Sequence, residues 1–257
     1  MKKQNIKMVI SYDGSRYLGW QRLGGSQKTQ SIQGYIEDTL EYIAGYSVAI
    51  IGSGRTDAGV HALGQVANFY VPSSFFLSHT LEELQQMCNE RLPEDIRILS
   101  VEEVPKDFHS RYSATRKTYE YHVDTREVPV VFTRKYALWE SKQLDLEAMR
   151  ECSRLFVGKH DFKAFSTQSK EEKDTVRTIF DFSIEQNDHE LIFSVCGDGF
   201  LYNMVRILVG TLLEVGRGER SRQQVAEALR TGDRQLAGYT VSSVGLFLKE
   251  VYYGKRW

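Results

Sequence analysis

The sequence predicts an α+β fold built from two ferredoxin-like halves, each with the element order β-α-β-β-α-β. Strand-like and helix-like segments follow one another in this order over residues 5–104, and the order returns after Pro105. Capping residues mark where the helices begin. We therefore expect two domains, 1–105 and 106–257, whose strands form one extended, mainly antiparallel sheet with helices on one face and a central cleft.

The first half opens with a strand and a capped helix. Residues 5–12 are rich in β-branched and aromatic side chains and end at an Asp-Gly turn. Ser31 is a suitable N-cap for a helix that runs to Ala44, along which apolar residues recur at helical spacing. Gly45 ends this helix.

The rest of the first half contains three strands and a second helix. Thr80 and Glu83 form a capping box for a helix that reaches Arg91, where Pro93 stops it. The strands are β-branched runs between turn residues, and they are predicted at Ser47–Ser53, Leu63–Val71 and Ile96–Val104.

The second half repeats the order with one added helix. Asp145 caps a helix that Gly158 closes, and Ser221 with Gln224 caps the added helix, which ends at Arg230. The same signals predict the remaining elements, which are strands at 115–124, Thr175–Glu185, Glu190–Cys196 and 245–253 and a helix over Tyr202–Val215. The two halves share the order of elements and no evident sequence identity.

The charge of the chain is balanced overall and uneven locally. Among 257 residues, 33 are Lys or Arg and 34 are Asp or Glu, which gives a formal net charge of −1. Residues 109–136 contain six basic and three acidic side chains, whereas residues 82–103 contain two basic and seven acidic ones. A polyanionic partner would therefore meet a local basic surface, although scattered solvated charge gives such counts as well.

Cysteine usage and hydropathy favour a cytoplasmic, soluble protein. Cys88, Cys152 and Cys196 are widely spaced, with no Cys-x-x-Cys pair and no Cys/His cluster, which indicates a reducing compartment and no structural zinc. No segment approaches the ~18 apolar residues of a membrane helix, because the best candidate is interrupted by Asn203 and Arg206. We expect no membrane association.

The connection between the second and third predicted strands carries the chemistry. Residues 52–61 read Gly-Ser-Gly-Arg-Thr-Asp-Ala-Gly-Val-His, so the backbone can turn tightly beside a ligand and present Arg55 and Asp57. A plain hairpin loop, in which Asp57 makes an Asx-turn and Arg55 is solvated, fits the spacing as well. The segment is neither a phosphate-binding loop nor a serine nucleophile elbow.

Residues 54–62 resemble the active-site motif of the TruA-type tRNA pseudouridine synthases, and the resemblance extends over nearly the whole chain. The other segments that are similar to motifs of this family are Tyr12-Asp13-Gly14, Gly19-Trp20-Gln21-Arg22, Phe108–Ala114, His160-Asp161-Phe162, Phe200–Arg206 and Gly245-Leu246. The resemblance implies the pseudouridine synthase fold, in which two ferredoxin-like halves enclose an active cleft. This fold agrees with the element order found above.

The resemblance also implies a reaction and a set of roles. The reaction isomerises uridine by breaking the N-glycosidic bond, turning the uracil and joining its C5 to C1′, which requires no metal and no cofactor. Asp57 would be the nucleophile, held ionised by Arg206, because burial alone raises a carboxyl pKa and a nearby cation lowers it. Tyr119 would stack on the flipped-out base, and Arg55, Arg111 and Leu246 would hold the nucleotide.

Two of these residues could instead have a purely structural role. Arg206 interrupts an apolar helical run, where it either pairs with a carboxylate or extends outward to solvent. Tyr119 lies two residues from Tyr121 on the same strand face, where both rings could simply belong to the core.

The implied substrate is the anticodon stem-loop of tRNA at positions 38, 39 and 40, bound by a homodimer without a small-molecule cofactor. We expect basic side chains beside the motifs to contact tRNA phosphates. These side chains are Arg16, Arg22, Lys28, Arg111, Arg116, Lys117, Arg217, Arg220 and Arg222.

The sequence departs from the family pattern at Asn68, where the family has histidine, at residues 240–244, and in the loop Gly24–Gln30, which is slightly longer than usual. These departures flank the expected cleft or the entrance for RNA, so they bear on which tRNA positions are modified more than on the chemistry. Two alternatives to the isomerase remain at this stage: a tRNA-binding protein without catalysis, and a small-molecule enzyme on the same fold.

Overall fold

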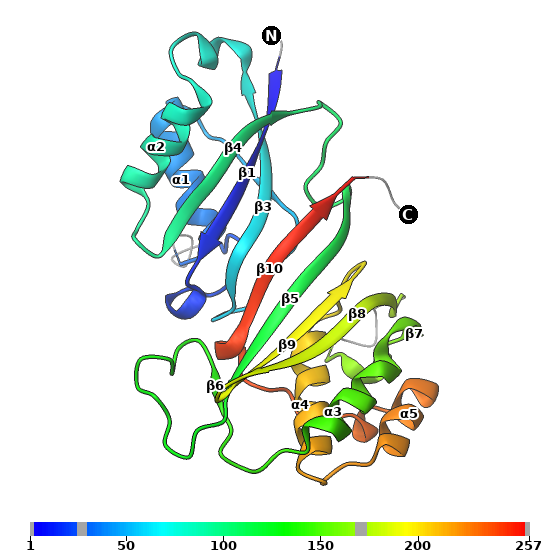
Figure 1. Cartoon of the computed structure of the whole chain (residues 1–257). Helices are drawn as coiled ribbons and strands as arrows, with labels where there is room; N and C mark the ends of the chain where they lie inside the picture. Colours follow the sequence, from blue (N-terminus) through cyan, green and yellow to red (C-terminus); the bar gives the residue numbers. More distant parts are fainter. Residues whose placement is uncertain (1–2, 25–29, 168–173, 255–257) are drawn as a thin grey trace. The chain divides into compact units, whose positions relative to one another are not determined.

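The structure is a computed structural model that describes residues 3–24, 30–167 and 174–254. The chain divides into two units: unit 1 comprises Met1–Thr115 and Phe247–Trp257, and unit 2 comprises Arg116–Leu246. In each unit the strands pair mostly antiparallel and helices lie beside them (Figure 1). The predicted α+β class is confirmed.

The unit boundaries differ from the predicted halves at 1–105 and 106–257 in two places. The segment after Pro105 stays with unit 1 because the Asn5 side-chain amide donates to the carbonyls of Pro105 and Phe108, at 3.0 and 2.8 Å. The last strand also returns to unit 1, where it pairs in parallel with the strand that begins at His61.

The sheet of unit 1 has the order β4-β1-β3-β10. The central strand β1 (Lys3–Tyr12) is antiparallel to both β3 (His61–Pro72) and β4 (Ile96–Val104). The strand β10 (Leu246–Tyr253) continues the sheet beyond β3. A two-residue strand, β2 (Ile51–Gly52), also pairs with β3.

Two helices lie along one side of this sheet (Figure 1). The first, α1 (Ile32–Ala44), begins at its predicted cap, since the Ser31 hydroxyl accepts the Gly34 N–H at 3.2 Å, and it ends at Gly45 in the left-handed conformation. The second, α2 (Leu81–Arg91), has the predicted capping box. Alternate apolar side chains of β1 are fully buried with apolar side chains of both helices, as expected for the core of a sheet covered on one face.

The predicted strand Ser47–Ser53 is wrong over most of its length. Only β2 forms, because the backbone of Ile50 is bonded by side chains of α1 instead of by a neighbouring strand. The Glu37 carboxylate accepts the Ile50 N–H at 3.1 Å, and the Gln33 amide donates to the Ile50 carbonyl at 3.3 Å. Val48 and Ile50, two of the apolar residues that suggested a strand, are buried without strand pairing.

The sheet of unit 2 has the order β5-β9-β8-β7. Its long strands are β5 (Ala114–Asp124), β8 (Val176–Asn187) and β9 (Glu190–Gly197). Two short strands were not predicted: β6 (Leu138–Trp139) pairs with β5, and β7 (Gly158–Asp161) pairs with β8.

The helices of unit 2 are α3 (Leu146–Ser153), α4 (Met204–Gly216) and α5 (Arg222–Thr231). Asp145 caps α3 as predicted, but Gly158 does not close it. The helix ends at Ser153, and Gly158, with φ 112°, begins β7 instead. Within the described ranges, no helix is both long and apolar enough to cross a membrane.

Candidate active site

The loop Ser53–Val60 presents Arg55 and Asp57, and its first residues are tied to β3. The Ser53 N–H donates to the Val66 carbonyl at 2.7 Å, and the Ser53 hydroxyl donates to Oε1 of Gln65 at 2.6 Å. The amide of Gln65 donates in turn to the carbonyl next along the loop, at 3.1 Å. Ser53 and Gln65 are fully buried, so these bonds fix the start of the loop from inside the unit.

The middle of the loop is held through Thr56. Its carbonyl accepts the Trp20 N–H at 3.0 Å, and its hydroxyl lies 2.8 Å from the hydroxyl of Tyr12. The carbonyl of Asp57 then accepts the Val60 N–H at 3.1 Å, which closes a tight turn. The residues before and after Asp57 are therefore attached to other parts of unit 1.

Arg55 and Asp57 are the side chains that this anchored backbone presents. Arg55 is exposed and Asp57 is partly exposed, whereas Thr56 between them is buried. The alternation places the guanidinium and the carboxylate away from the core while the intervening hydroxyl faces inward. A rigid loop that carries a carboxylate beside a cation is suited to hold a reacting group in one position.

The segment before α1 packs closely against this loop. A Cβ at Gly14 would collide with the carbonyl oxygen of Val60, and a Cβ at Gly19 would lie 2.6 Å from the carbonyl oxygen of Thr56. Gly19 also has φ 101°, a conformation that favours glycine. The glycines of the two N-terminal motifs therefore allow backbone to pack directly on the Asp57 loop.

His61 follows the loop and is buried. Its Nδ1 lies 3.1 Å from the Gly14 nitrogen, which donates to it, and its ring stacks on Phe247 with the centroids 4.6 Å apart. The histidine of the motif thus joins the N-terminal segment, the loop and the last strand within unit 1.

In unit 2, the structure separates the two tyrosines that the sequence placed on one face of a strand. Tyr121 is fully buried and its hydroxyl donates to the Ser242 carbonyl at 2.7 Å. Burial raises the pKa of the Tyr121 hydroxyl, which keeps this donor protonated. Tyr119 is only partly buried, with its ring edge-to-face to Phe200 at 5.1 Å.

Arg206 lies in the first turn of α4 and is partly buried. Its Nε donates to the Val241 carbonyl at 2.7 Å, and its Nη1 donates to the Asn203 side-chain oxygen, also at 2.7 Å. Because Tyr121 holds the next carbonyl, at Ser242, the two side chains fix consecutive peptides of one segment.

That segment leads into Leu246. A Cβ at Gly245 would lie 3.1 Å from the Tyr121 ring and 2.5 Å from the His122 carbonyl, so the chain before β10 packs closely on β5. Leu246 itself is 6% exposed, as a core residue would be, and its role as a pocket wall stays a prediction.

The predicted site residues are divided between the units. Unit 1 brings together Arg55 and Asp57, and it also carries Arg111, which is exposed. Unit 2 carries the other three residues, which are Tyr119, Arg206 and Leu246. The pairing of Asp57 with Arg206 stays a prediction.

The segment that carries Arg111 is held by Asn68, one of the three departures from the family pattern; most of another, the loop Gly24–Gln30, lies outside the described residues. The Asn68 oxygen accepts the Ser110 N–H at 2.9 Å, and its amide donates to Asn5 at 2.9 Å. Asn68 is fully buried, and its side-chain amide acts as both donor and acceptor at the position where the family has histidine.

Comparison with known proteins decides the family. A family described as tRNA pseudouridine synthase matches residues 8–113 and 152–254, which include the Asp57 loop, Tyr202 to Arg206 and the Leu246 segment. The chain belongs to the tRNA pseudouridine synthase family. It is therefore an isomerase that acts on uridine in tRNA, and the alternatives without this activity are set aside.

Relatives of the synthase match over almost its entire length. The tRNA pseudouridine synthase A of Bacillus sp. (strain KSM-64) is 47% identical over 249 residues, which are 97% of this chain and 99% of the relative. The tRNA pseudouridine synthase A 2 of Clostridium perfringens (strain 13 / Type A) is 44% identical over 97% of this chain and all of its own length. A relative from Acetivibrio thermocellus is 41% identical with the same coverage.

Several of the basic side chains expected to contact phosphate form ion pairs within the synthase. In each pair a carboxylate oxygen lies 2.6–2.8 Å from the guanidinium group, so the charge of the arginine is balanced within its own unit. The pairs are Arg16 with Asp95, Arg22 with Glu37 and Asp38, Arg217 with Glu140, and Arg220 with Glu214. Lys28 lies outside the described residues.

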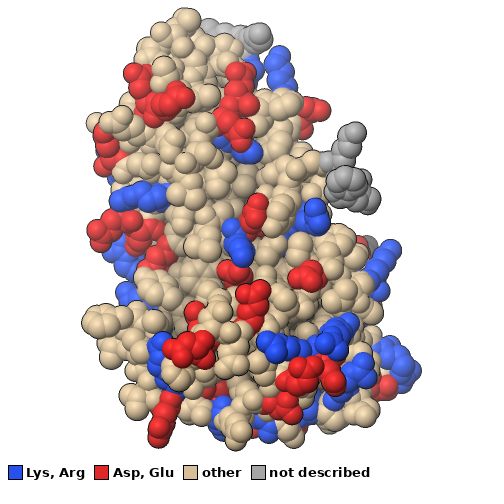
Figure 2. Space-filling model, viewed as in Figure 1, with Lys and Arg blue, Asp and Glu red and all other residues tan. Residues whose placement is uncertain are grey.

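On the face shown in Figure 2, basic and acidic side chains are interspersed. This agrees with a net charge near zero and with the internal ion pairs. The exposed cations of the motifs, Arg55 and Arg111, are therefore the residues whose placement best fits contact with a polyanion.

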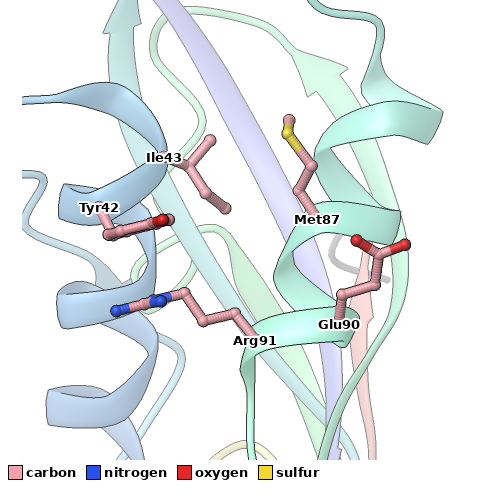
Figure 3. A pocket seen from close by; sticks show the side chains of 5 residues that line it. All are labelled: Tyr42, Ile43, Met87, Glu90 and Arg91. Atoms are coloured by element: carbon pink, nitrogen blue, oxygen red, sulfur yellow. The ribbon is translucent and has the colours of Figure 1, made fainter.

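A groove of about 660 Å³ lies between α1 and α2, away from the residues of the site. Tyr42 and Ile43 line it from α1, and Met87, Glu90 and Arg91 line it from α2 (Figure 3). The Arg91 guanidinium stacks 3.6 Å from the centre of the Tyr42 ring. None of these residues belongs to the motifs, so the groove does not extend the site.

No group of three potential metal ligands of the His, Cys, Asp or Glu type occurs in the described part of the synthase. All three cysteines are free. Burial raises the pKa of the Cys88 thiol to about 12 and that of Cys152 to about 11, which makes both poor nucleophiles near neutral pH. Neither of these two thiols is suited to act as a nucleophile in a reaction near neutral pH.

Several residues that hold the candidate site residues within their own unit were given no such role from the sequence. These residues are Tyr12, Thr56, Gln65, Tyr121 and Asn203. Tyr12, Thr56 and Asn203 lie inside the quoted motifs. Their polar side chains within a motif were the sequence feature that could have indicated a supporting role. Gln65 and Tyr121 lie on strands, where a buried polar residue is identified only once its hydrogen-bond partner is known.

Replacing Gly14 by alanine is expected to lower the free energy of unfolding by about 1–3 kcal/mol, because the new methyl group collides with the Val60 carbonyl and the loop must move. Pseudouridine formation should fall in the same variant. Urea unfolding and a tritium-release assay measure the two effects. The matched control is Gly24→Ala, since a Cβ at Gly24 meets nothing within 4 Å. Equal stability of the two variants would contradict the expectation.

Proposed function

We propose that this synthase converts uridine to pseudouridine at positions 38, 39 and 40 in the anticodon stem-loop of tRNA, with Asp57 as the nucleophile. The observation that carries the proposal is the anchored loop that presents Asp57 beside the exposed Arg55. The choice of positions rests on the resemblance of the motifs to the TruA-type family.

The proposed chemistry needs one carboxylate and no change of oxidation state. Asp57 attacks either the sugar at C1′ or the base at C6, and the N1–C1′ bond breaks. The uracil turns until C5 faces C1′, the C5–C1′ bond forms and the carboxylate leaves. C5 loses its hydrogen and N1 gains a proton, so the product has the same composition as the substrate.

The other residues have supporting roles under this proposal. Arg206 supplies a positive charge that favours the ionised form of Asp57. Tyr119 stacks on the extruded base, which offsets part of the few kcal/mol that extrusion costs. Arg55 and Arg111 bind phosphate or ribose, and Leu246 forms a wall of the base pocket.

Replacing Tyr119 by leucine is expected to lower the single-turnover rate by roughly 10- to 100-fold, because base stacking on an aromatic ring contributes about 1–3 kcal/mol. The control Tyr119→Phe keeps the ring and removes only the hydroxyl, so it should retain most of the rate. A phenylalanine variant as slow as the leucine variant would show that the hydroxyl matters and that stacking is not the main contribution.

Tritium release tests the proposed function directly. Forming the C5–C1′ bond displaces the hydrogen of C5, so tRNA labelled with tritium at C5 of its uracils should release label when the purified synthase is added. Mapping of pseudouridine in the product then gives the positions. Label release with pseudouridine outside positions 38–40 would overturn the assignment of the positions and leave the chemistry in place.

Salt dependence of binding supplies an independent check on the tRNA contact. Each phosphate contact releases counterions, so the affinity should fall as the ionic strength rises. With the internal ion pairs already satisfied, a modest slope is expected, set by cations such as Arg55 and Arg111. A salt-independent affinity would contradict phosphate contacts.

The proposal includes a homodimer that works in the cytoplasm. Unit 2 exposes apolar side chains on one connection, with Val128 75%, Val131 64% and Phe132 87% exposed. Apolar residues this close together on a surface are typical of a protein–protein contact. Sedimentation of the purified synthase at micromolar concentration tests the dimer, and a monomer under those conditions would contradict it.

A further inference from the structure

We infer that the Tyr12 hydroxyl is a positioning group that fixes the orientation of Asp57, an inference that rests on the nucleophilic role proposed above. Tyr12 ends β1, is 4% exposed and lies with its hydroxyl 2.8 Å from the Thr56 hydroxyl. Thr56 directly precedes Asp57. Tyr12 itself is too deeply buried to touch a nucleotide, so its effect on the reaction must pass through the loop.

The Tyr12 hydroxyl belongs to a group of buried polar side chains that hold the start and the middle of the loop. Gln65, beside the Tyr12 hydroxyl, accepts the Ser53 hydroxyl at 2.6 Å and donates to the Gly54 carbonyl at 3.1 Å. Burial raises the pKa of the Tyr12 hydroxyl, so the group keeps its proton for hydrogen bonding throughout the working pH range. A connected network of this kind is more rigid than separate bonds.

Thr56 is attached twice, which restricts the peptide that leads to Asp57. Its carbonyl is held by the Trp20 N–H at 3.0 Å and its side chain by Tyr12 at 2.8 Å. With only the backbone bond, Thr56 could change its side-chain rotamer and the following carboxylate could turn. A small displacement of a reacting group is enough to slow a reaction that depends on positioning.

The ring and the hydroxyl of Tyr12 have separable roles. The ring packs against Trp20, with centroids 6.1 Å apart, and Trp20 fills the space over Gly52, where a Cβ would lie 2.5 Å from the indole nitrogen. Tyr12→Phe keeps this packing and removes one oxygen atom. The variant therefore leaves the core intact and tests the hydroxyl alone.

The experiment measures the single-turnover rate and the tRNA affinity of four variants. Tyr12→Phe and Thr56→Val should each lower the rate by roughly tenfold, as expected for one lost buried hydrogen bond, with the dissociation constant for tRNA changed less than twofold. Thr56→Ser keeps the hydroxyl and should restore the rate. The double variant Tyr12→Phe/Thr56→Val should be no slower than the slower single variant, because both remove the same bond.

The chain offers a matched control in Tyr70, which lies on β3 in the same unit and whose hydroxyl donates to the Lys106 carbonyl at 3.2 Å. Tyr70→Phe removes the same chemical group away from the loop and should react at the normal rate. An equal slowing in Tyr70→Phe would show that the loss is a general effect of stability and would overturn the inference.

The remaining outcomes separate this inference from the proposed function. A normal rate for Tyr12→Phe, or a loss that appears only in tRNA affinity or in melting temperature, overturns the positioning role. Asp57→Asn is assayed alongside. If Asp57→Asn stays active, the proposed nucleophile is wrong; if it is inactive while Tyr12→Phe is normal, only the inference about Tyr12 fails.

Discussion

Asp57→Asn is expected to lower pseudouridine formation by roughly 10⁴-fold or more, as the loss of a nucleophile does in other enzymes. The asparagine has the same shape as the aspartate but is a far poorer nucleophile. The turn closed by the Asp57 carbonyl and the Val60 N–H uses backbone atoms alone, so the loop should keep its conformation. Single-turnover tritium release measures the rate.

The variant should still fold and bind tRNA. Its melting temperature is expected to stay within a few degrees of the parent, because Asp57 is only partly buried. Glu94→Gln makes the same acid-to-amide change at an exposed position of unit 1 and should leave the rate unchanged. Activity in Asp57→Asn at a level close to the parent would remove Asp57 from the mechanism.

Arg206→Met is expected to produce the second largest loss, roughly 10²- to 10³-fold in rate, as for the removal of a charged group that stabilises reacting charge. If Arg206 favours the anionic form of Asp57, its removal makes the carboxylate harder to ionise. The acidic limb of the rate–pH profile should then move to higher pH. A profile measured between pH 5 and 9 checks both effects.

Arg206→Lys distinguishes charge from geometry. Lysine keeps the charge, so the acidic limb should stay near its normal position, while the fork that reaches the Val241 carbonyl and the Asn203 oxygen is lost. Arg154→Met, at a side chain 71% exposed in unit 2, is the control for the loss of any arginine. An unchanged profile in Arg206→Met would contradict a charge role.

Local signals in the sequence were sufficient for most of the fold. The capping boxes at Thr80 and Ser221 and the cap at Asp145 are present where predicted, because a cap depends on residues three positions apart. Strand Ser47–Ser53 failed for the opposite reason. The backbone of Ile50 is hydrogen-bonded by Gln33 and Glu37, side chains of α1. The spacing of apolar residues along the sequence gives no indication of such bonds.

The candidate site was predictable to the extent that its residues are contiguous. Arg55 and Asp57 lie in one loop, and the structure shows how that loop presents them. The supporting contacts join distant parts of the sequence, such as Tyr12 with Thr56 and Tyr121 with Ser242. Such contacts depend on how the strands align, which composition and spacing do not determine.

The place of β10 in unit 1 has a consequence for the order in which the nascent chain matures. Phe247 stacks on His61 and pairs with it across the parallel strands, although about 185 residues lie between them in the sequence. During translation, unit 1 therefore lacks its last strand until all of unit 2 has been synthesised. The unit whose sequence begins first is thus completed after the unit that interrupts it, and His61 at the end of the Asp57 loop meets Phe247 only then.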